Sequence, residues 1–460
     1  MALKDMALTD YINKPYRCSC GKTHMADIGE IIIENGALAK LPDVLSRVKL
    51  NGGEPLDKNR HGVFMLADEN TYAAAGKQAE DLIVGSGYKL HKLILKGAVV
   101  PNETTIFDVL YAIGADDNLL VAAGSGTIND ICRFLSFKVN RPYISVATAP
   151  SMDGFASIVS PVVIRNMKIS PPSTTPRAII GDTGILKKAP AHMIAAGLGD
   201  ILGKYNALCD WKISSIVTGE DYCPEIASMV ESATKKCEES AAGLAGRDEA
   251  SIALLMEALT LTGIAMCFWR LSRPASSAEH HIAHFWEMSL MFENREPALH
   301  GAKVGVASVA AAFLHKKLSG YKIDFEKALS AAETFDYDKW RENARREFKN
   351  GADDIINQEI SARINAPENR TGRIRALEAH WPEVVGIINN YTPSVARLKE
   401  LLTLARGPVS PPQINVSRET ALRGLLYAKD ARVIYSVLQV LNDLSLLGEF
   451  ADECLEMMFE

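Results

Sequence analysis

The stretch NLLVAAGSGTIND, residues 118–130, decides the expected fold. Its first six residues are mostly apolar and predict a buried strand, and residues 130–138 predict a helix soon after the glycine-rich turn. Backbone N–H groups in such a turn, at the start of a helix, let a dinucleotide pyrophosphate approach the chain. The turn lacks the third glycine of the GxGxxG fingerprint. On the motif alone, a tight strand-to-helix turn without a ligand is therefore an equal alternative.

Strands and helices alternate on both sides of this stretch. Strands are predicted at residues 62–67, 91–100 and 143–147, and helices at residues 71–85 and 104–113. Such alternation is typical of a parallel sheet covered by helices. Ligands of these sheets bind beyond the carboxyl ends of the strands. Three features follow predicted strands and so should share that edge: Asp68, the glycine-rich turn, and the segment Thr148–Pro150.

The pattern changes after the last of these strands. Residues 162–164 and 178–180 predict strands that flank a polar, proline-rich segment, which suggests a hairpin or flap. Strand signals largely vanish from about residue 190, and a proline-rich loop at 407–412 should precede a final pair of helices. We therefore expect an α/β dinucleotide-binding domain with a parallel sheet at residues 1–189 and an all-α domain at residues 190–460.

Composition narrows the class of protein. A chain of 460 residues with 47% hydrophobic and 23% charged residues suits a globular protein of two or three domains. The net charge of −6 argues against a general nucleic-acid binder. Eight scattered cysteines suit a reducing compartment, and no signal peptide is apparent at the N-terminus. The most apolar long stretch, residues 251–269, contains Glu257 and predicts a buried helix rather than a membrane span. We expect a cytoplasmic protein.

One carboxylate and two imidazoles stand out as candidate metal ligands. Asp200 lies in AAGLGDILGKY, where Lys204 follows on the same helical face. A surface ion pair is the alternative, but the glycine and aliphatic neighbours favour a buried helix, in which a carboxylate needs a metal or another cation. His280 and His284 share a helix face, and His300 begins another helix. Asp200, His280 and His300 form a ligand set for a divalent transition metal with room for substrate.

Other candidate residues have a structural alternative. Asp68 suits hydrogen bonding to an adenosine ribose or capping of the next helix, and capping is favoured. Asp153 lies in an Asp-Gly pair. It either forms a turn, which is favoured when the pair is taken in isolation, or directs its carboxylate toward a substrate. The segment CSCGKTH, residues 18–24, offers three ligand types at a spacing that is unfavourable for a zinc finger, so a local turn is favoured.

Five segments together resemble a known family. GSGTIND, TAPSMDGFAS, AGLGDILGKY, SSAEHHIAHFWEM and LHGAKVGVAS occur in this order within residues 62–312, and all resemble the bacterial sn-glycerol-1-phosphate dehydrogenase family. That family lies in the superfamily of dehydroquinate synthase and the iron-containing alcohol dehydrogenases. The start of the chain, CSCGKTH, is similar to the bacterial branch.

The resemblance implies an activity and a set of residue roles. The implied reaction is the metal-dependent reduction of dihydroxyacetone phosphate to sn-glycerol 1-phosphate with NAD(P)H, in a homodimer that holds nickel or zinc. Asp200, His280 and His300 would bind the metal. Asp153, Asp200 and His284 would face the substrate, with Asp153 and His284 as catalytic groups and His284 in the proton relay. Arg273 would bind the phosphate, with Lys204 and Lys168 as other candidates. The implied cofactor contacts are Asp68, Gly124, Ser125, Gly126, Thr127, Ile128, Thr148, Ala149, Pro150, Ser151 and Ser157.

Other functions remain as alternatives at this point. A glycerol or polyol dehydrogenase of the same superfamily would share the metal and cofactor but lack a phosphate site. A dehydroquinate synthase-like lyase would use its nicotinamide only transiently. A metal-stabilised scaffold would have no activity. The sequence also leaves open the metal, the choice between NADH and NADPH, and whether the product serves phospholipid metabolism or another glycerophosphate.

Overall fold

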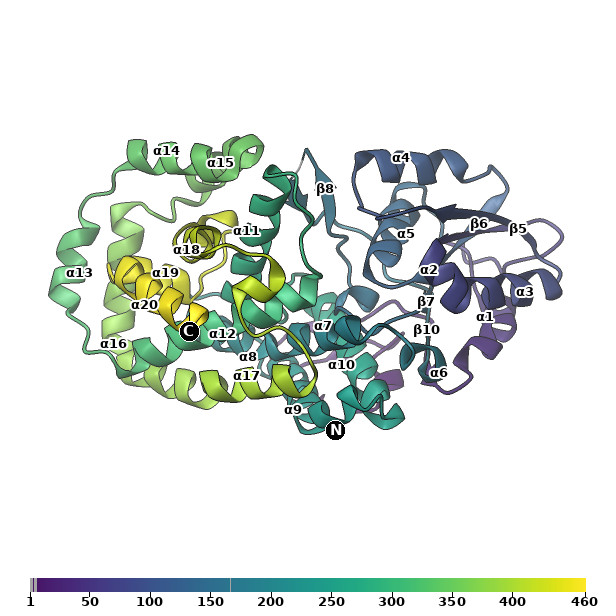
Figure 1. Cartoon of the computed structure of the whole chain (residues 1–460), viewed down its shortest axis with the longest axis horizontal. Coiled ribbons are helices and arrows are strands. Elements are labelled where there is room, and N and C mark those ends of the chain that lie inside the picture. The colour runs from purple at the N-terminus through teal and green to yellow at the C-terminus, as the bar shows by residue number, and fades with distance from the viewer. Residues whose placement is uncertain (1–2, 4–5, 166) are drawn as a thin grey trace.

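The computed structural model of the chain describes residues 3, 6–165 and 167–460. A twisted sheet with its helices forms one half of the molecule, and helices alone form the other (Figure 1). The main sheet has six strands in the order β3-β10-β7-β6-β4-β5, and every neighbouring pair is parallel. Its strands are β3 (Glu30–Glu34), β4 (Gly62–Asp68), β5 (Lys89–Leu95), β6 (Asp117–Gly124), β7 (Tyr143–Ala147) and β10 (Ala178–Asp182).

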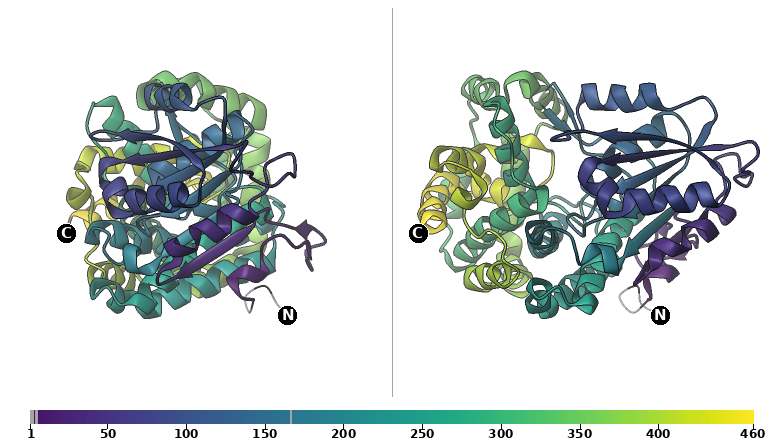
Figure 2. Two further views of the ribbon diagram at one scale, coloured as in Figure 1. Left: turned by 90° about the vertical axis from the view of Figure 1, so that its right-hand side faces the viewer. Right: turned by 45° about the vertical axis from the view of Figure 1, so that its right-hand side comes forward.

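Helices cover both faces of this sheet (Figure 2). Along β4, Val63 and Met65 pack in one apolar cluster with helices on one face, and Phe64 and Leu66 pack in another cluster on the opposite face. This alternation follows from the two-residue period of a strand and explains the continuous apolar run of the sequence. The covering helices are α1 (Leu41–Arg47), α2 (Glu69–Thr71), α3 (Lys77–Gly85), α4 (Glu103–Ala112) and α5 (Gly126–Lys138).

The parallel sheet and its helices confirm the expected α/β half, with two corrections. The edge strand β3 was not predicted, because its apolar run, EIIIE, is short and does not belong to the regular alternation of strands and helices. It pairs with β10, far along the chain. The hairpin is also shorter than expected. β8 (Val162–Ile164) pairs with β9 (Met167–Ile169), while β10 joins the main sheet instead.

The residues before β3 contact the helical half. Strands β1 (Tyr16–Arg17) and β2 (Thr23–His24) form a small antiparallel hairpin. The Tyr16 hydroxyl donates to Glu225 at the start of α9, and Lys22 forms an ion pair with Asp221 at 2.7 Å. The N-terminus accordingly lies beside α9 in Figure 1.

From α6 (Thr183–Leu186) onward, every described element is helical. The inner helices are α7 (Ala191–Leu202), α8 (Lys204–Val217), α9 (Pro224–Ala245), α10 (Glu249–Trp269), α11 (Ala278–Phe292) and α12 (His300–Gly320). The outer helices are α13 (Phe325–Ala332), α14 (Tyr337–Phe348), α15 (Ala352–Ala362), α16 (Pro367–Tyr391), α17 (Val395–Leu404), α18 (Arg418–Tyr427), α19 (Val437–Asp443) and α20 (Leu447–Phe459). Three helices rather than a pair follow the proline-rich loop.

Among the described residues, α10 alone is long and apolar enough to cross a membrane by length and composition. However, 78% of its apolar 18-residue window is buried inside the protein. Leu255, Leu259 and Ile264 have no exposed surface, and they join the apolar cluster that packs around α7 and α9. The helix is therefore part of the core, as residues 251–269 predicted.

Candidate functional site

The glycine-rich turn lies at the carboxyl edge of the sheet. Gly124 ends β6 and α5 begins at Gly126, so the turn joins a buried strand directly to a helix start. A Cβ atom at position 124 would lie 2.5 Å from the Ile128 Cβ, so only glycine allows this close approach. Residues 125–127 are partly exposed, which leaves the backbone N–H groups of the first turn of α5 accessible.

The turn sits where the order of the strands reverses. β5 lies on one side of β4. The next strand, β6, lies on the other side, and β7 and β10 follow beyond it in that direction. Ligands of open α/β sheets bind in the crevice at such a switch point. Asp68 ends β4 beside it and caps α2: its Oδ1 accepts a hydrogen bond from the Thr71 amide at 2.8 Å. The capping role favoured from sequence is thus present.

The segment 148–154 connects this turn to the helical half. At one end, the Thr148 amide donates to the Gly124 carbonyl at 3.2 Å. At the other end, the Asp153 amide donates to Asp200 Oδ2 at 3.0 Å. Between them, the Pro150 carbonyl lies so close to α7 that a Cβ at Gly197 would be 1.9 Å from its oxygen. The turn and Asp200 are therefore held together by one short stretch of backbone.

Glycine contacts between α7 and α12 bring the predicted metal ligands together. A Cβ at Gly199 would lie 2.4 Å from the Gly301 carbonyl oxygen, and a Cβ at Gly301 would lie 2.0 Å from the Ala196 carbonyl oxygen. The two helix backbones therefore touch. Asp200 follows Gly199, and His300 precedes Gly301, so this contact places the carboxylate beside the imidazole.

Asp200, His280 and His300 converge from α7, α11 and α12. One potential ligand atom from each lies within 4.8 Å of the other two. His280 Nε2 lies 3.6 Å from Asp200 Oδ1, and the His280 and His300 ring centroids are 5.2 Å apart. His300 Nδ1 is buried and has no hydrogen-bond partner among the described residues. Structural metal sites need a complete shell, whereas three protein ligands leave a position open for substrate.

Buried neighbours orient this cluster. His280 Nδ1 lies 2.8 Å from the Glu279 carboxylate, which is fully buried, and so Nε2 faces Asp200. Burial disfavours the imidazolium, but Asp200 and Glu279 outweigh it and raise the pKa of His280. A carboxylate behind a ligating histidine fixes its orientation and raises its basicity.

A lysine bridges the two carboxylates of the site. Lys204 Nζ has no exposed surface and lies 2.6 Å from Asp153 Oδ2 and 2.9 Å from Asp200 Oδ1. Burial opposes the charge of Asp200, yet Lys204, His280 and His300 hold its pKa well below the usual range. Burial and the neighbouring Asp200 raise the pKa of Asp153. Asp153 thus belongs to the same network as the predicted metal ligands.

His284 lies beside the three ligands, next to an arginine. Its ring centroid is 5.4 Å from that of His300, and Arg432 Nη2 donates to His284 Nδ1 at 3.4 Å. Since Nδ1 accepts, Nε2 carries the proton of the neutral ring. Burial, together with Lys168 and Arg432, holds the pKa of His284 well below its ordinary value. His284 is therefore neutral at physiological pH and does not titrate there, unlike an unperturbed histidine.

Arg273 is engaged elsewhere. Its side chain is 2% exposed, and its Nε atom forms an ion pair with Glu220 at 3.0 Å. Nη1 donates to Ser277 at 3.1 Å, and Nη2 donates to the carbonyls of Asp210 and Tyr435. These partners occupy the guanidinium in a structural network, so the contacts do not favour its expected role with a substrate phosphate.

The other predicted cations differ in their freedom to bind an anion. Lys168, in β9, lies 2.9 Å from Glu287 on α11 and so links the hairpin to the helical half. Burial raises the pKa of Glu287, but Lys168 and Lys303 lower it to about 2. In the part of the chain that the structure describes, Arg432 has no carboxylate within ion-pair distance. Lys168 and Lys303 are paired with Glu287, so Arg432 is the cation near the histidines that is most available to bind an anion.

The remaining predicted cofactor contacts lie along the same backbone. Thr148, Ala149 and Ser151 are buried in the segment that follows β7. The Ser157 hydroxyl donates to the Val159 carbonyl at 3.2 Å, so it closes a local turn.

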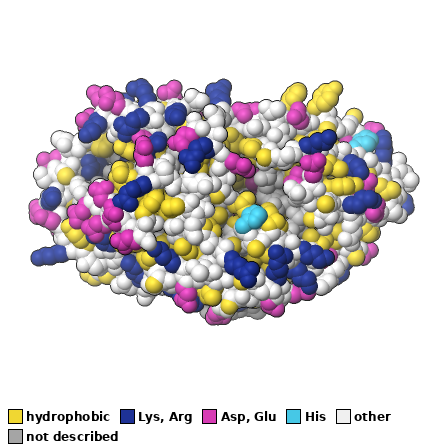
Figure 3. Space-filling model, viewed as in Figure 1, with side chains coloured by type: hydrophobic (Ala, Val, Ile, Leu, Met, Phe, Trp, Pro, Cys, Tyr) yellow, Lys and Arg dark blue, Asp and Glu magenta, His cyan; other side chains and the backbone are white. Residues whose placement is uncertain are grey.

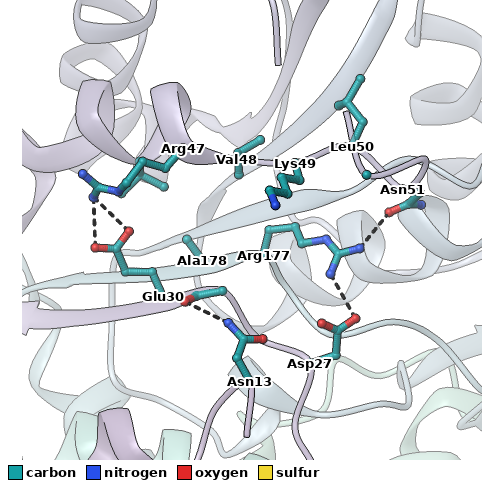
Figure 4. Close-up of a pocket in the computed structure, with 13 residues that line it drawn as sticks. Asn13, Asp27, Glu30, Arg47, Val48, Lys49, Leu50, Asn51, Arg177 and Ala178 are labelled. Atoms are coloured by element: carbon teal, nitrogen blue, oxygen red, sulfur yellow. Dashed lines mark hydrogen bonds and ion pairs between the residues drawn. The ribbon is translucent and has the colours of Figure 1, made fainter. Parts of the chain in front are cut away.

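The pocket drawn in Figure 4 is a different place. Its lining includes Glu30 and Ala178, which begin β3 and β10, so it lies at the amino-terminal edge of the sheet. Arg47 forms an ion pair with Glu30, and Arg177 forms one with Asp27, so these two arginines are already paired (Figure 4). No residue of the histidine cluster lines it, and it plays no part in the site.

Three site residues were not predicted. Glu279 directly precedes His280. Glu287 lies on the same helix face as His280 and His284, and its i,i+7 and i,i+3 spacing from them is a usable signal. Arg432 lies in a loop near the end of the chain, and no local pattern points to it.

Comparison with known proteins supports the same assignment. The family model described as iron-containing alcohol dehydrogenase matches residues 32–190. The NAD(P)+ glycerol-1-phosphate dehydrogenase of Halalkalibacterium halodurans is 36% identical over 312 residues, which cover 67% of this chain and 76% of that protein. The Bacillus licheniformis protein of the same name is 29% identical over 446 residues, 96% of each chain, so the likeness extends well past residue 312.

Solved structures share the fold. Glycerol dehydrogenase from Schizosaccharomyces pombe aligns with a TM-score of 0.59 and 15% identity, covering 94% of this chain and 91% of that one. With the sequence relatives and the resemblance of the five site segments, these matches lead to one conclusion. The chain belongs to the glycerol-1-phosphate dehydrogenase family of the iron-containing alcohol dehydrogenases.

Proposed function

We propose that this protein is a metal-dependent oxidoreductase that reduces dihydroxyacetone phosphate to sn-glycerol 1-phosphate with NAD(P)H. The observation that carries the proposal is the short segment 148–154. It hydrogen-bonds to the glycine-rich turn at Gly124 and to Asp200 among the three converging ligands. A dinucleotide at the turn and a metal at the ligands would therefore be neighbours. The names of the relatives point to the same substrate.

The chemistry of the residues fits a divalent metal held by Asp200, His280 and His300. His300 Nδ1 is a buried nitrogen without a partner among the described residues, and Glu279 orients His280 from behind. When bound, nickel or zinc would supply Lewis-acid polarisation of a carbonyl. The ligand types suit both metals. Lys204 compensates the charges of Asp153 and Asp200 and holds the Asp200 carboxylate toward the histidines.

The glycine-rich turn fits a dinucleotide. Of residues 124–128, the three from 125 to 127 are partly exposed at the start of α5, where a pyrophosphate is stabilised by hydrogen bonds and the helix dipole. Asn129, on the same first turn, is buried, and the nitrogen and oxygen of its side-chain amide have no hydrogen-bond partner among the described residues. The segment 148–151 lies alongside and would contact the nicotinamide end. Asp68, at the end of β4, would contact the ribose.

Replacing Gly124 with alanine is expected to weaken NADH binding by roughly 5- to 150-fold. The new Cβ would overlap Ile128 and push the start of α5 off its position, and overpacking of this kind costs about 1–3 kcal/mol. Quenching of NADH fluorescence gives the dissociation constant. Gly85→Ala is the control, because a Cβ there meets open space at the end of α3. Equal affinities in the wild type, Gly124→Ala and Gly85→Ala would mean that the cofactor does not bind at this turn.

Replacing His284 with alanine is expected to lower turnover by about 10²-fold while metal content stays intact. The neutral ring holds its proton on Nε2 because Arg432 donates to Nδ1, so it can hydrogen-bond the oxygen that gains charge and pass a proton from water. Steady-state kinetics and metal analysis of the same sample check this. Loss of the metal would instead identify His284 as a ligand.

Arg432 is our candidate for binding the substrate phosphate. Replacing it with glutamine is expected to raise KM for dihydroxyacetone phosphate by about 10- to 100-fold, because one hydrogen bond to a charged group is weakened. Turnover of unphosphorylated dihydroxyacetone should change little, because that substrate lacks the anion. Arg375→Gln is the control, since Arg375 is exposed on α16. An equal loss of activity with both substrates would mean that Arg432 acts only by orienting His284 and does not bind the phosphate.

One assay separates the proposal from its rivals. Enzyme loaded with nickel or zinc is incubated with NADH and dihydroxyacetone phosphate, and the chirality of the glycerophosphate is determined. A polyol dehydrogenase would prefer dihydroxyacetone. A lyase would cause no net change in NADH absorbance, and a scaffold would oxidise no NADH with any triose.

The broader expectations remain proposals as well. We propose an α/β domain at residues 1–189 and a helical domain at residues 190–460, with the N-terminal hairpin docked on the second. We also propose a cytoplasmic homodimer, and the eight free cysteines are consistent with a reducing compartment. In the face drawn in Figure 3, acidic and basic side chains are interspersed, which is consistent with a small-molecule rather than a nucleic-acid partner.

A further inference from the structure

A second cluster of ligand groups lies away from the histidine site. Cys18, Cys20 and His24 of the N-terminal hairpin meet Cys223, which directly precedes α9. One potential ligand atom from each of the four lies within 4.8 Å of the others. From sequence, CSCGKTH offered only three ligands at an unfavourable spacing. The fold supplies the fourth from a position 205 residues after Cys18.

Three distances between the ligand atoms are close to those of a tetrahedral metal site. The Cys18 and Cys223 sulfurs are 3.4 Å apart, and His24 Nε2 lies 3.3 Å from Cys20 Sγ and 3.7 Å from Cys223 Sγ. With Zn–S bonds near 2.3 Å and Zn–N bonds near 2.0 Å, a tetrahedron separates its ligand atoms by about 3.5–3.8 Å. A disulfide would need its sulfurs about 2.05 Å apart.

The histidine ring is oriented for this role. His24 Nδ1 lies 3.0 Å from the Phe268 carbonyl, which can only accept, so Nδ1 carries the proton and Nε2 offers its lone pair to the sulfurs. The ring also stacks on the Phe268 side chain, with centroids 5.5 Å apart. Ligating histidines are commonly held in this way by a carbonyl behind them.

Burial raises the pKa of the Cys18 and Cys223 thiols, and hydrogen bonds from two backbone amides oppose this rise. The Cys20 amide points at Cys18 Sγ, and the Ile226 amide points at Cys223 Sγ, both at 3.5 Å. Cys223 is the N-cap residue of α9, where the helix dipole also stabilises negative charge. Cys223 and His24 are at most 1% exposed and Cys20 is partly exposed, so an ion held here would be shielded from water on all but the Cys20 side.

We propose that Cys18, Cys20, His24 and Cys223 bind a zinc ion that cross-links the N-terminal hairpin to the helical half. Four protein ligands leave no position for substrate, so this site is structural and separate from the one at Asp200. The ion stabilises the docking of the hairpin on α9 and α10, because its binding free energy adds to that of folding.

Cobalt substitution tests the proposal on the full-length protein. Purified protein is stripped of metal under reducing conditions and loaded with Co²⁺. Thiolate ligands should give an intense sulfur-to-cobalt charge-transfer band in the near ultraviolet. The ligands at Asp200, His280 and His300 contain no sulfur and cannot produce it. Absence of the band in the wild-type protein overturns the proposal, and this measurement does not depend on any variant folding.

Variants assign the band to these residues. Cys223→Ser and Cys20→Ser should each lose or strongly reduce it, and His24→Cys should keep it with a shifted maximum. Cys237→Ser is the matched control, because Cys237 is a buried cysteine within α9 and outside the cluster. A band that persists unchanged in both serine variants contradicts the assignment.

Metal and thiol counts complete the test. In a His280→Ala background, the protein should retain one zinc per chain as purified, and adding Cys223→Ser should remove it. Denatured, metal-free protein should show all eight cysteines as free thiols. Two fewer thiols, together with no zinc, would mean that Cys18 and Cys223 form a disulfide instead.

Discussion

Replacing His280 with alanine is expected to release the catalytic metal and to lower kcat/KM by about 10²- to 10³-fold, the cost of losing a central stabilising group. Among the described residues, three potential ligands converge on this position, so the loss of one leaves an incomplete ligand set. The variant also leaves Glu279 buried without the imidazole it contacts at 2.8 Å. Metal analysis of the purified protein and steady-state kinetics with dihydroxyacetone phosphate measure the two effects.

The neighbouring histidine provides a matched control. His281 lies on the same helix and is 1% exposed, and neither of its ring nitrogens has a hydrogen-bond partner among the described residues. Burial, with Arg432 and Arg273 nearby, lowers the pKa of His281 to about 3, so its ring is uncharged. His281→Leu should therefore keep both metal and activity within a few-fold. Equal losses in the two variants would mean that α11 is merely sensitive to substitution.

Replacing Lys204 with methionine is expected to destabilise the metal-free protein by about 3–5 kcal/mol, the usual cost of removing one partner from a buried ion pair. Lys204 has no exposed surface, and its ammonium compensates both Asp153 and Asp200. Without it, two carboxylates remain close together in the interior. A lower urea midpoint in the absence of metal measures the effect.

Metal should reverse part of this loss. A bound divalent cation restores positive charge beside Asp200, so nickel or zinc should raise the urea midpoint more in Lys204→Met than in the wild type. Lys316→Met is the control, because Lys316 is half-buried on α12 and, within the described part of the chain, its ammonium donates only to the Ile388 carbonyl. A Lys204→Met protein as stable as the control would show that the carboxylates do not need this cation.

The alternation of strands and helices was enough to predict most of the sheet. β4, β6, β7 and β10 are apolar runs bounded by turns, and each is buried on both faces. β3 escaped prediction because it is short and follows an irregular N-terminal segment, and because its partner, β10, follows about 150 residues later. Its place in the sheet is decided by tertiary packing, on which local periodicity has no bearing.

The candidate site divides in the same way. Asp200, His280 and His300 stand in distinctive local contexts, so their residue types alone suggested that they belong together. Lys204 was noted for its spacing, yet the sequence could not indicate that it also contacts Asp153. Arg432 and Cys223 lie in loops, and only the packed fold brings them to their partners. The spacing that suggested Arg273 likewise does not reveal which partners occupy its guanidinium.

The docking of the N-terminal hairpin affects the order in which the chain can fold during synthesis. Residues 16–24 leave the ribosome early, but their partners at Asp221, Cys223 and Glu225 emerge about 200 residues later, roughly 10–40 s at ordinary translation rates. The parallel sheet is complete at Asp182, before those partners exist. The hairpin therefore remains undocked while the sheet forms, and one of the first segments to be synthesised is among the last to make its native contacts.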